Sequence, residues 1–178
     1  MLIDEQKSRM LLENKWKKCR SRESLLISKI LLPHDGTKIS DKTLEKSKEF
    51  VKAFNAELYI LHVIEHSPLP PSLILDHDRQ WIEESRKNIA KKLKEGWIKM
   101  AKEKINPVLE KENIKFNIIV STDVQPISEQ ILNFASENKI DLIIIGSQRL
   151  SEISKIKALG SVSRKVSENV DCPIMIIH

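Results

Sequence analysis

Asp35, Gly36 and Thr37 are the first residues in the sequence whose types and spacing suit a binding site. They follow the apolar run of residues 28–32 after two further residues, Pro33 and His34. A carboxylate at such a point accepts hydrogen bonds from a ribose or an amino group, or it only holds a turn together. Both interpretations of Asp35 stay open at this stage.

A second group with suitable chemistry lies towards the C-terminus. Gly146 ends the apolar run 141–145, and Gly160 and Ser161 begin a helical pattern fourteen residues later. Glycine lets the backbone approach a bulky anion, and the amides of a first helical turn donate to phosphate. Ser161 and Ser163 add hydroxyl groups. The alternative is that Gly160 only ends a loop and Ser161 only caps a helix.

His62, Glu65 and His66 match the H-x-x-E-H spacing of a class of zinc proteases. That spacing brings both imidazoles to one metal only in a helix, whereas these residues run from a strand-like segment into a loop. A zinc site is therefore not expected. The sequence also lacks G-x-x-x-x-G-K-[ST], G-x-G-x-x-G and G-x-S-x-G patterns, which weakens the hypotheses of a P-loop NTPase, a dinucleotide-binding enzyme or an α/β-hydrolase.

The elements that must position these groups are short apolar runs rich in Ile, Leu and Val. They cover residues 28–32, 58–64, 116–120, 141–145 and 173–177. Runs of this length without polar alternation are typical of strands buried on both faces of a parallel sheet.

Four stretches between the runs have helical periodicity, at 40–55, 76–105, 128–138 and about 161–169. Ser40 or Asp41 is the expected N-cap of the first. In the second, apolar residues recur at three-, four- and seven-residue spacing, which predicts a buried stripe. Pro107 is expected to bend or end that helix. The stripe consists of Ile82, Ile89, Leu93, Trp97, Met100 and Ile105.

This alternation predicts an α/β fold with a single, doubly wound, five-strand parallel sheet and helices on both faces. We expect the strand order 3-2-1-4-5, in which the loops after the first and fourth strands open one crevice. Those loops are residues 33–36 and 146–163, so the two groups of candidate residues are predicted to meet there.

Composition limits the class of protein. The chain has 178 residues, two cysteines without a C-x-x-C pair, and a net charge of +5. No apolar run is long enough to span a bilayer and no signal peptide is recognisable, so a cytoplasmic protein without a membrane partner is expected. A nucleic-acid partner would need a denser basic face with aromatic residues, and is not expected. Residues 1–24 are an N-terminal extension, either a docked helical arm or a loose tail, and residues 25–178 form the domain.

Four segments together resemble the universal stress protein family. They are ISKILLPHDGT, LYILHVIE, DLIIIGSQRL and ALGSVSRKVSENVDCPIMIIH, and the similarity extends from Ile27 to His178. One branch of that family binds ATP through the pattern G-x-x-G, nine residues, G-[ST], and another branch does not bind it. The resemblance implies that Pro33 and Asp35 lie against adenine and ribose and that Val63 contacts the base through its backbone. It implies that the phosphates and ribose are lined by Gly146, Gly160, Ser161, Val162 and Ser163.

The sequence departs from that pattern at Arg149, which replaces the second glycine, and in its ten residues between Arg149 and Gly160. The Arg149 side chain either blocks the close backbone approach or binds a phosphate in bidentate fashion. The expected function is a stress-response or signalling module that binds ATP or AMP, with Mg²⁺ if the ligand is a triphosphate. The alternative is a protein-interaction module that binds no nucleotide. Turnover is not expected, although slow ATP hydrolysis stays open.

The last run, residues 173–177, is apolar, lies at the edge of the expected sheet and ends the sequence. An exposed apolar edge favours pairing with another chain. Members of the family commonly form dimers through this strand, so a homodimer is predicted.

Overall fold

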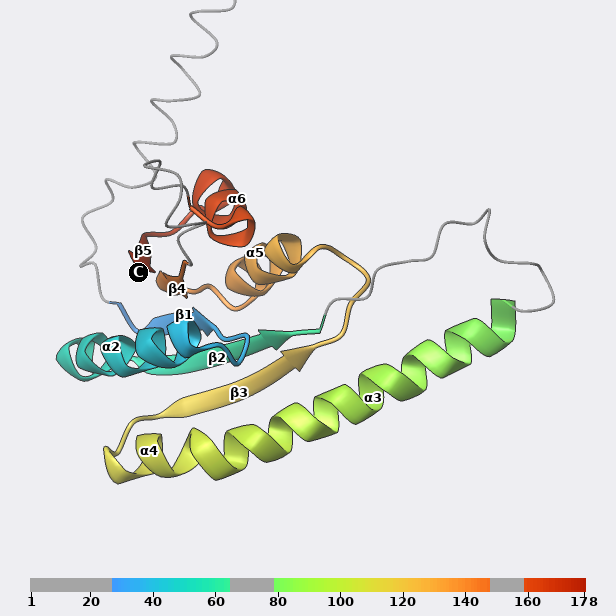
Figure 1. The fold of residues 1–178 in the computed structure, drawn as a ribbon. Helices are drawn as coiled ribbons and strands as arrows, with labels where there is room; N and C mark the ends of the chain where they lie inside the picture. Colours follow the sequence, from blue (N-terminus) through green and yellow to red (C-terminus); the bar gives the residue numbers. More distant parts are fainter. Residues whose placement is uncertain (1–26, 65–78, 148–158) are drawn as a thin grey trace, which may run out of the picture.

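The structure, a computed structural model, describes residues 27–64, 79–147 and 159–178 (Figure 1). Strands and helices alternate along the chain. The strands are β1 (Lys29–Pro33), β2 (Glu57–Val63), β3 (Phe116–Ser121), β4 (Leu142–Gly146) and β5 (Ile174–Ile177). The helices are α2 (Lys38–Phe54), α3 (Arg79–Lys104), α4 (Asn106–Lys111), α5 (Ile127–Glu137) and α6 (Ser161–Asn169). The proposed arm at residues 1–24 lies outside the described residues.

The five strands form one parallel sheet in the order β3-β2-β1-β4-β5, which confirms the predicted order. In β1, Leu31 pairs with Tyr59 of β2 on one side and with Ile143 of β4 on the other. The strand order therefore reverses at β1 and β4, and the loops after these two strands leave from the same edge of the sheet.

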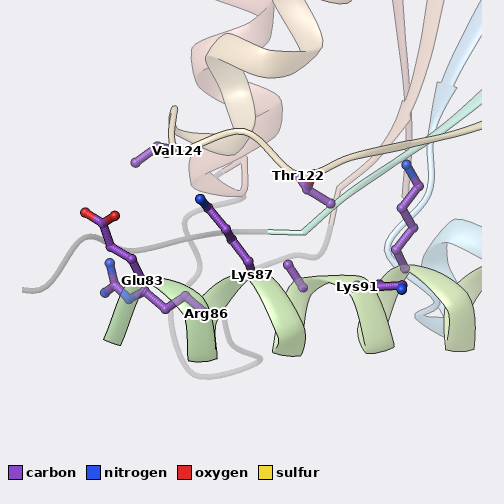
Figure 2. A pocket seen from close by; sticks show the side chains of 8 residues that line it. Glu83, Arg86, Lys87, Lys91, Thr122 and Val124 are labelled. Atoms are coloured by element: carbon purple, nitrogen blue, oxygen red, sulfur yellow. The ribbon is translucent and has the colours of Figure 1, made fainter. Parts of the chain in front are cut away.

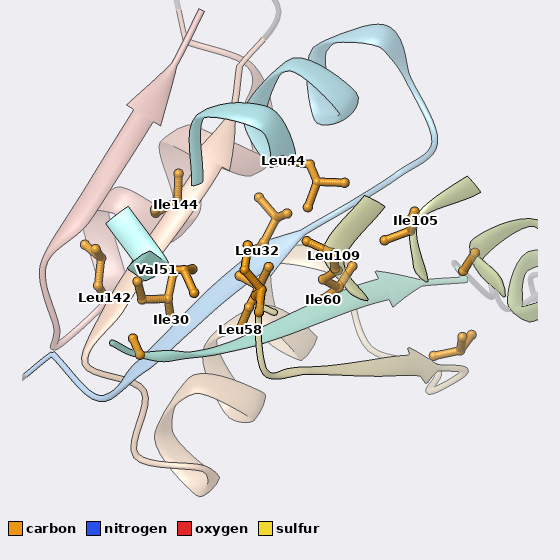
Figure 3. Packing of buried hydrophobic residues seen from close by; sticks show 14 of the residues in the cluster. Ile30, Leu32, Leu44, Val51, Leu58, Ile60, Ile105, Leu109, Leu142 and Ile144 are labelled. Carbon is orange, nitrogen blue, oxygen red and sulfur yellow. The ribbon is translucent and has the colours of Figure 1, made fainter. Parts of the chain in front are cut away.

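Alternate residues of β1 point to opposite faces of the sheet, and both faces are buried. Ile30 and Leu32 pack with α2, α3 and α4, while Leu31 packs with α5 and α6. Figure 3 shows Leu32 towards Leu44 of α2 and Leu109 of α4, and Ile30 nearer Val51 of α2. All three β1 side chains are fully buried, and each contributes on the order of 1.5–3 kcal/mol through the hydrophobic effect.

Helix α2 begins earlier than expected, and its N-cap is Thr37, not Ser40 or Asp41. The backbone of Thr37 is extended, and its hydroxyl oxygen accepts from the Ser40 amide at 3.4 Å. Ser40 is itself in the first turn, where its hydroxyl donates to the Thr37 carbonyl at 2.7 Å. The cap thus lies immediately after the Asp35–Gly36 turn.

Helix α3 only partly follows the predicted buried stripe. Trp97 and Ile105 are buried, but Ile89 and Leu93 are 57% and 53% exposed. The N-terminal part of α3 extends beyond the ends of the neighbouring strands (Figure 1). Ala90, next to Ile89, is nevertheless buried, so the packed face of α3 runs through Ala90, Trp97 and Ala101 and leaves Ile89 and Leu93 to one side. The helix ends at Lys104, and α4 begins with Pro107 in its first turn, which confirms the break expected at that proline. No described helix is both long and apolar enough to cross a bilayer.

Candidate functional site

A cavity of about 140 Å³ lies at the sheet edge where β1 and β4 end. Its walls are largely apolar and come from β2, β4 and α5, and its polar rim comes from the segment after β1. Five residues predicted from the sequence line it: Pro33, Asp35, Val63, Gly146 and Val162. The other described lining residues are His34, Ile39, Ser40, Leu61, Ile127, Ile131 and Ile145.

Asp35 holds the turn that leads into α2. Its Oδ1 accepts from the Thr37 amide at 3.0 Å and from the Thr37 hydroxyl at 2.7 Å. Burial acts to raise the pKa of the Asp35 carboxyl, but hydrogen bonds from Thr37 and Ser40 outweigh it, and the pKa lies below its ordinary value. Gly36 has φ +83°, a conformation that favours glycine. An ionised carboxylate with unused acceptor capacity is therefore fixed at the rim.

His34 lies behind this turn and was not predicted as a site residue. Its Nδ1 accepts from the Gly36 amide at 3.2 Å, which leaves the proton of the neutral ring on Nε2, 3.2 Å from Asp41 Oδ1. Burial lowers the pKa of His34 below its ordinary value, although Asp41 and Asp35 act to raise it. A neutral His34 thus joins the turn to the first turn of α2.

His62 supports His34 from β2. Its Nδ1 donates to the His34 carbonyl at 2.8 Å, and its ring stacks on Trp97 with centroids 4.5 Å apart and planes 12° apart. Burial lowers the pKa of His62 also. His62 is a strand residue, as expected, while Glu65 and His66 lie outside the described residues. The described part of the chain contains no group of three or more His, Cys, Asp or Glu side chains placed to hold a metal.

Ser147 joins the end of β4 to the start of α6. Its buried hydroxyl oxygen accepts from the Gly160 amide at 3.1 Å and lies 3.0 Å from the Ser163 hydroxyl. The sequence analysis missed Ser147, although a small polar residue directly after a buried strand was a usable signal. One amide at the start of α6 is therefore engaged, and the first-turn amides of Ser161, Val162 and Ser163 remain as the helix's donors.

Gly146 is required for packing on one side of β4. A Cβ on Gly146 would lie 2.8 Å from Thr43 Oγ1 and 2.9 Å from Ile39 Cγ2, both on α2. Only a residue without a side chain lets α2 approach this strand so closely. Gly146 also lines the cavity. The structure thus shows Gly146 in close contact with α2, whereas the sequence predicted that this glycine would allow the close approach of an anion.

Three of the remaining predicted residues lie at the start of α6. Gly160 is the N-cap of α6, Ser161 is exposed in its first turn, and Ser163 is buried against Ser147. Arg149 lies outside the described residues.

Comparison with known proteins identifies the family. The model of the universal stress protein family matches residues 27–178. This chain belongs to the universal stress protein family. The match includes every residue that the structure describes.

Relatives of this universal stress protein cover most of its length. Universal stress protein YxiE of Bacillus subtilis is 33% identical over 158 residues, which span 86% of this chain and 100% of that protein. Universal stress protein MJ0531 of Methanocaldococcus jannaschii is 28% identical over 152 residues, 85% of this chain and 82% of that protein. The protein in the solved structure of MJ0577 is 26% identical to this chain. The similarity covers 85% of this chain and 96% of that chain, with a TM-score of 0.62.

Two solved members of the family contain nucleotides. A universal stress protein of Archaeoglobus fulgidus was solved in complex with dAMP, and another universal stress protein in complex with cAMP. They are 16% and 20% identical to this chain, with TM-scores of 0.51 and 0.52. At these identities the similarity establishes the shared fold.

Proposed function

We propose that this universal stress protein binds an adenine nucleotide in the cavity between the Asp35 turn and the start of α6, as a module of stress response or signalling. The supporting observation is that Pro33, Asp35, Gly146 and Val162 line one cavity although they come from distant parts of the chain. The dAMP and cAMP complexes of two other family members support the class of ligand.

The base is proposed to occupy the apolar part of the cavity. Pro33, Val63 and Val162 offer it nonpolar surface, and the Val63 backbone offers hydrogen bonds. Pockets that hold a whole small-molecule ligand usually have a volume of about 300–1,000 Å³. The 140 Å³ of the cavity therefore suits the base alone. The ribose lies at the rim, where the Asp35 carboxylate accepts from its hydroxyl groups.

The phosphates are proposed to lie over the first turn of α6. The amides there point out of the helix and carry its positive dipole end, which favours an anion. Ser161 is exposed and offers its hydroxyl as a further donor. The bond between Ser147 and Gly160 fixes this helix end beside β4, so the donors are held in place before the ligand arrives. A triphosphate would bring Mg²⁺ with it. Arg149 would either bind or obstruct the phosphates.

Binding without turnover is the proposed activity. His34 is a poor general base, because both ring nitrogens are engaged, with Gly36 and Asp41. Asp35 has a lowered pKa, which weakens it as a base near neutral pH.

The experiment is a thermal denaturation series with ATP, AMP and cAMP. A ligand that binds only the folded state raises the melting temperature, by an amount that grows with its concentration. We expect a rise with at least one of the three, and phosphate release from ATP would reveal slow hydrolysis. No rise at millimolar concentrations of all three would contradict the proposal and favour the protein-interaction module that binds no nucleotide.

A homodimer through β5 is proposed as well. Strand β5 is at the edge of the sheet, and its four apolar residues are each only partly buried in the single chain. Pairing with the same strand of a second copy would cover them.

A further inference from the structure

A second, larger cavity lies between α3 and the segment after β3, and it shares no described lining residue with the β1–β4 crevice. It has a volume of about 590 Å³, within the range of about 300–1,000 Å³ that small-ligand sites occupy. Its α3 wall carries three lysines: Lys87, Lys91 and Lys94. Its other described lining residues are Glu83, Arg86, Ala90, Thr122 and Val124.

The lysines of this groove carry unbalanced charge. Helix α3 has nine Lys or Arg residues against four Glu, and none of the acidic residues lies between 86 and 94. Within the described residues, no carboxylate forms an ion pair with Lys87, Lys91 or Lys94. Like charges four residues apart, such as Lys87 and Lys91, destabilise a helix. A bound anion would remove that repulsion.

The opposite wall is held rigidly by Gln130. This buried side chain accepts from the Ser121 hydroxyl at 2.5 Å and donates to the carbonyls of Asp123 and Gln125 at 3.0 and 2.6 Å. The backbone around Val124 is therefore fixed from inside the domain. A preformed wall lowers the entropic cost of binding.

The groove combines an apolar floor with a row of cations. Ala90 is buried, while Val124 is 61% exposed and so offers nonpolar surface. Figure 2 shows Lys87 rising from α3 towards the segment that carries Thr122 and Val124. Lys87 and Lys94 are seven residues apart, so the charged row extends about 10 Å along the helix axis. Glu83 lies among the lining residues at the N-terminal end of the row.

We propose that this groove binds a small organic polyanion, a compound with a nonpolar body and at least two phosphate or carboxylate groups. The anionic groups contact the Lys87, Lys91 and Lys94 ammonium groups, and the nonpolar body covers Ala90 and Val124. This site is separate from the proposed nucleotide site.

Isothermal titration of the full chain at constant ionic strength tests the site, with sodium tripolyphosphate as the phosphate probe and citrate as the carboxylate probe. We expect at least one probe to bind. The variant Lys87→Gln with Lys91→Gln is expected to weaken its binding about tenfold or more, because each lost ammonium group removes a charge-assisted contact. The matched control is Lys92→Gln with Lys99→Gln, which removes the same charge from exposed α3 positions that do not line the groove. The control is expected to change affinity less than about twofold.

Lysine acetylation mapped by mass spectrometry locates the probe. Bound probe is expected to protect Lys87, Lys91 and Lys94, while Lys92 and Lys99 react as before. The proposal is overturned if neither probe binds at millimolar concentration or if both double variants weaken binding equally. If ATP displaces the probe and the bound probe does not protect these lysines, the probe binds in the other cavity, which would also overturn the proposal. If neither probe binds but single-stranded RNA binds through these lysines, the assignment to a small ligand is overturned.

Discussion

Gly146 and Thr43 lie so close that no side chain fits between them, since a Cβ on Gly146 would be 2.8 Å from Thr43 Oγ1. Gly146→Ala is therefore expected to destabilise the fold by about 1–3 kcal/mol through overpacking. Urea unfolding measures the change. Gly96→Ala in α3 is the control, because its Cβ would meet no atom of the described residues within 4 Å and alanine favours a helix by about 1 kcal/mol. Equal effects of the two substitutions would contradict the packing role of Gly146.

The two roles of Asp35 can be separated by substitution. Asp35→Asn keeps an Oδ1 that accepts from Thr37 but loses the charge, whereas Asp35→Ala loses both. We expect Asp35→Asn to weaken nucleotide binding about tenfold and to lower the melting temperature of the free protein less than Asp35→Ala does. Asp35→Ala should lower both the nucleotide affinity and the melting temperature, because Thr37, the N-cap of α2, loses its hydrogen bonds to Asp35. Titration calorimetry and thermal denaturation measure the two effects, and unchanged nucleotide affinity in both variants would remove Asp35 from the proposed site.

Stability is expected to fall as the pH drops from 7 to 5. Burial lowers the pKa of His34 and of His62 in the folded state, while both have ordinary values near about 6.5 when unfolded. Below that pH the unfolded chain binds more protons, so the free energy of unfolding decreases until the pH is below the folded-state pKa values. The lowered pKa of Asp35 adds a separate loss in the acidic range below about pH 4.

Urea unfolding at several pH values measures this loss. The variant His34→Gln with His62→Gln cannot titrate at these positions and should show a smaller slope between pH 7 and 5. An unchanged slope in that variant would show that other groups cause the dependence. A titration of the ring protons by NMR should give both histidines pKa values below the ordinary one.

Ser147→Ala is expected to loosen the start of α6. The substitution leaves the Gly160 amide without its acceptor, at a cost of about 1–3 kcal/mol if no water replaces the hydroxyl. Nucleotide affinity should fall too, because the first-turn amides lose their fixed position. Ser167→Ala is the matched control, since the Ser167 hydroxyl donates to the Arg164 carbonyl of the same helix and has no other partner among the described residues. If the two variants bind nucleotide equally well, the Ser147 bridge does not position the phosphate site.

The fold was largely predictable from the sequence, because each buried strand is a short run of aliphatic residues between helical segments. The continuous apolar run of β1 and the break at Pro107 are local features, so a local sequence pattern is enough to predict them. Helix α3 was less predictable. Periodicity shows that Ile89 and Leu93 lie near one another on the helix, but it does not show that the packed face runs through Ala90 and Trp97 instead.

The candidate site was predictable in outline only. Strand order brings the segments after β1 and β4 together, so Asp35 and Gly146 could be expected at one edge. The Ser147–Gly160 bond and the stack of His62 on Trp97 connect residues that are distant in sequence. No local pattern encodes such contacts. The close contact of Gly146 with α2 likewise depends on how closely that helix approaches β4, which a local pattern does not record.

Ile176→Pro is expected to prevent dimer formation through β5 while it preserves the fold of each chain. The Pro173 carbonyl accepts from the Ile143 amide of β4 at 3.0 Å, and the Ile177 carbonyl accepts from the Ser147 amide just after β4 at 2.8 Å. Because successive residues of a strand point their backbone hydrogen-bonding groups to opposite sides, those of Ile174 and Ile176 face the outer edge. Proline at 176 removes one outward N–H that a partner strand would need, without removing a bond to β4. Light scattering coupled to size exclusion should give the wild type twice its chain mass of 20.5 kDa and the variant a single chain mass. Ile176→Val is the control and should stay dimeric; a wild type that is monomeric, or an Ile176→Pro variant that remains a folded dimer, would exclude this edge as the interface.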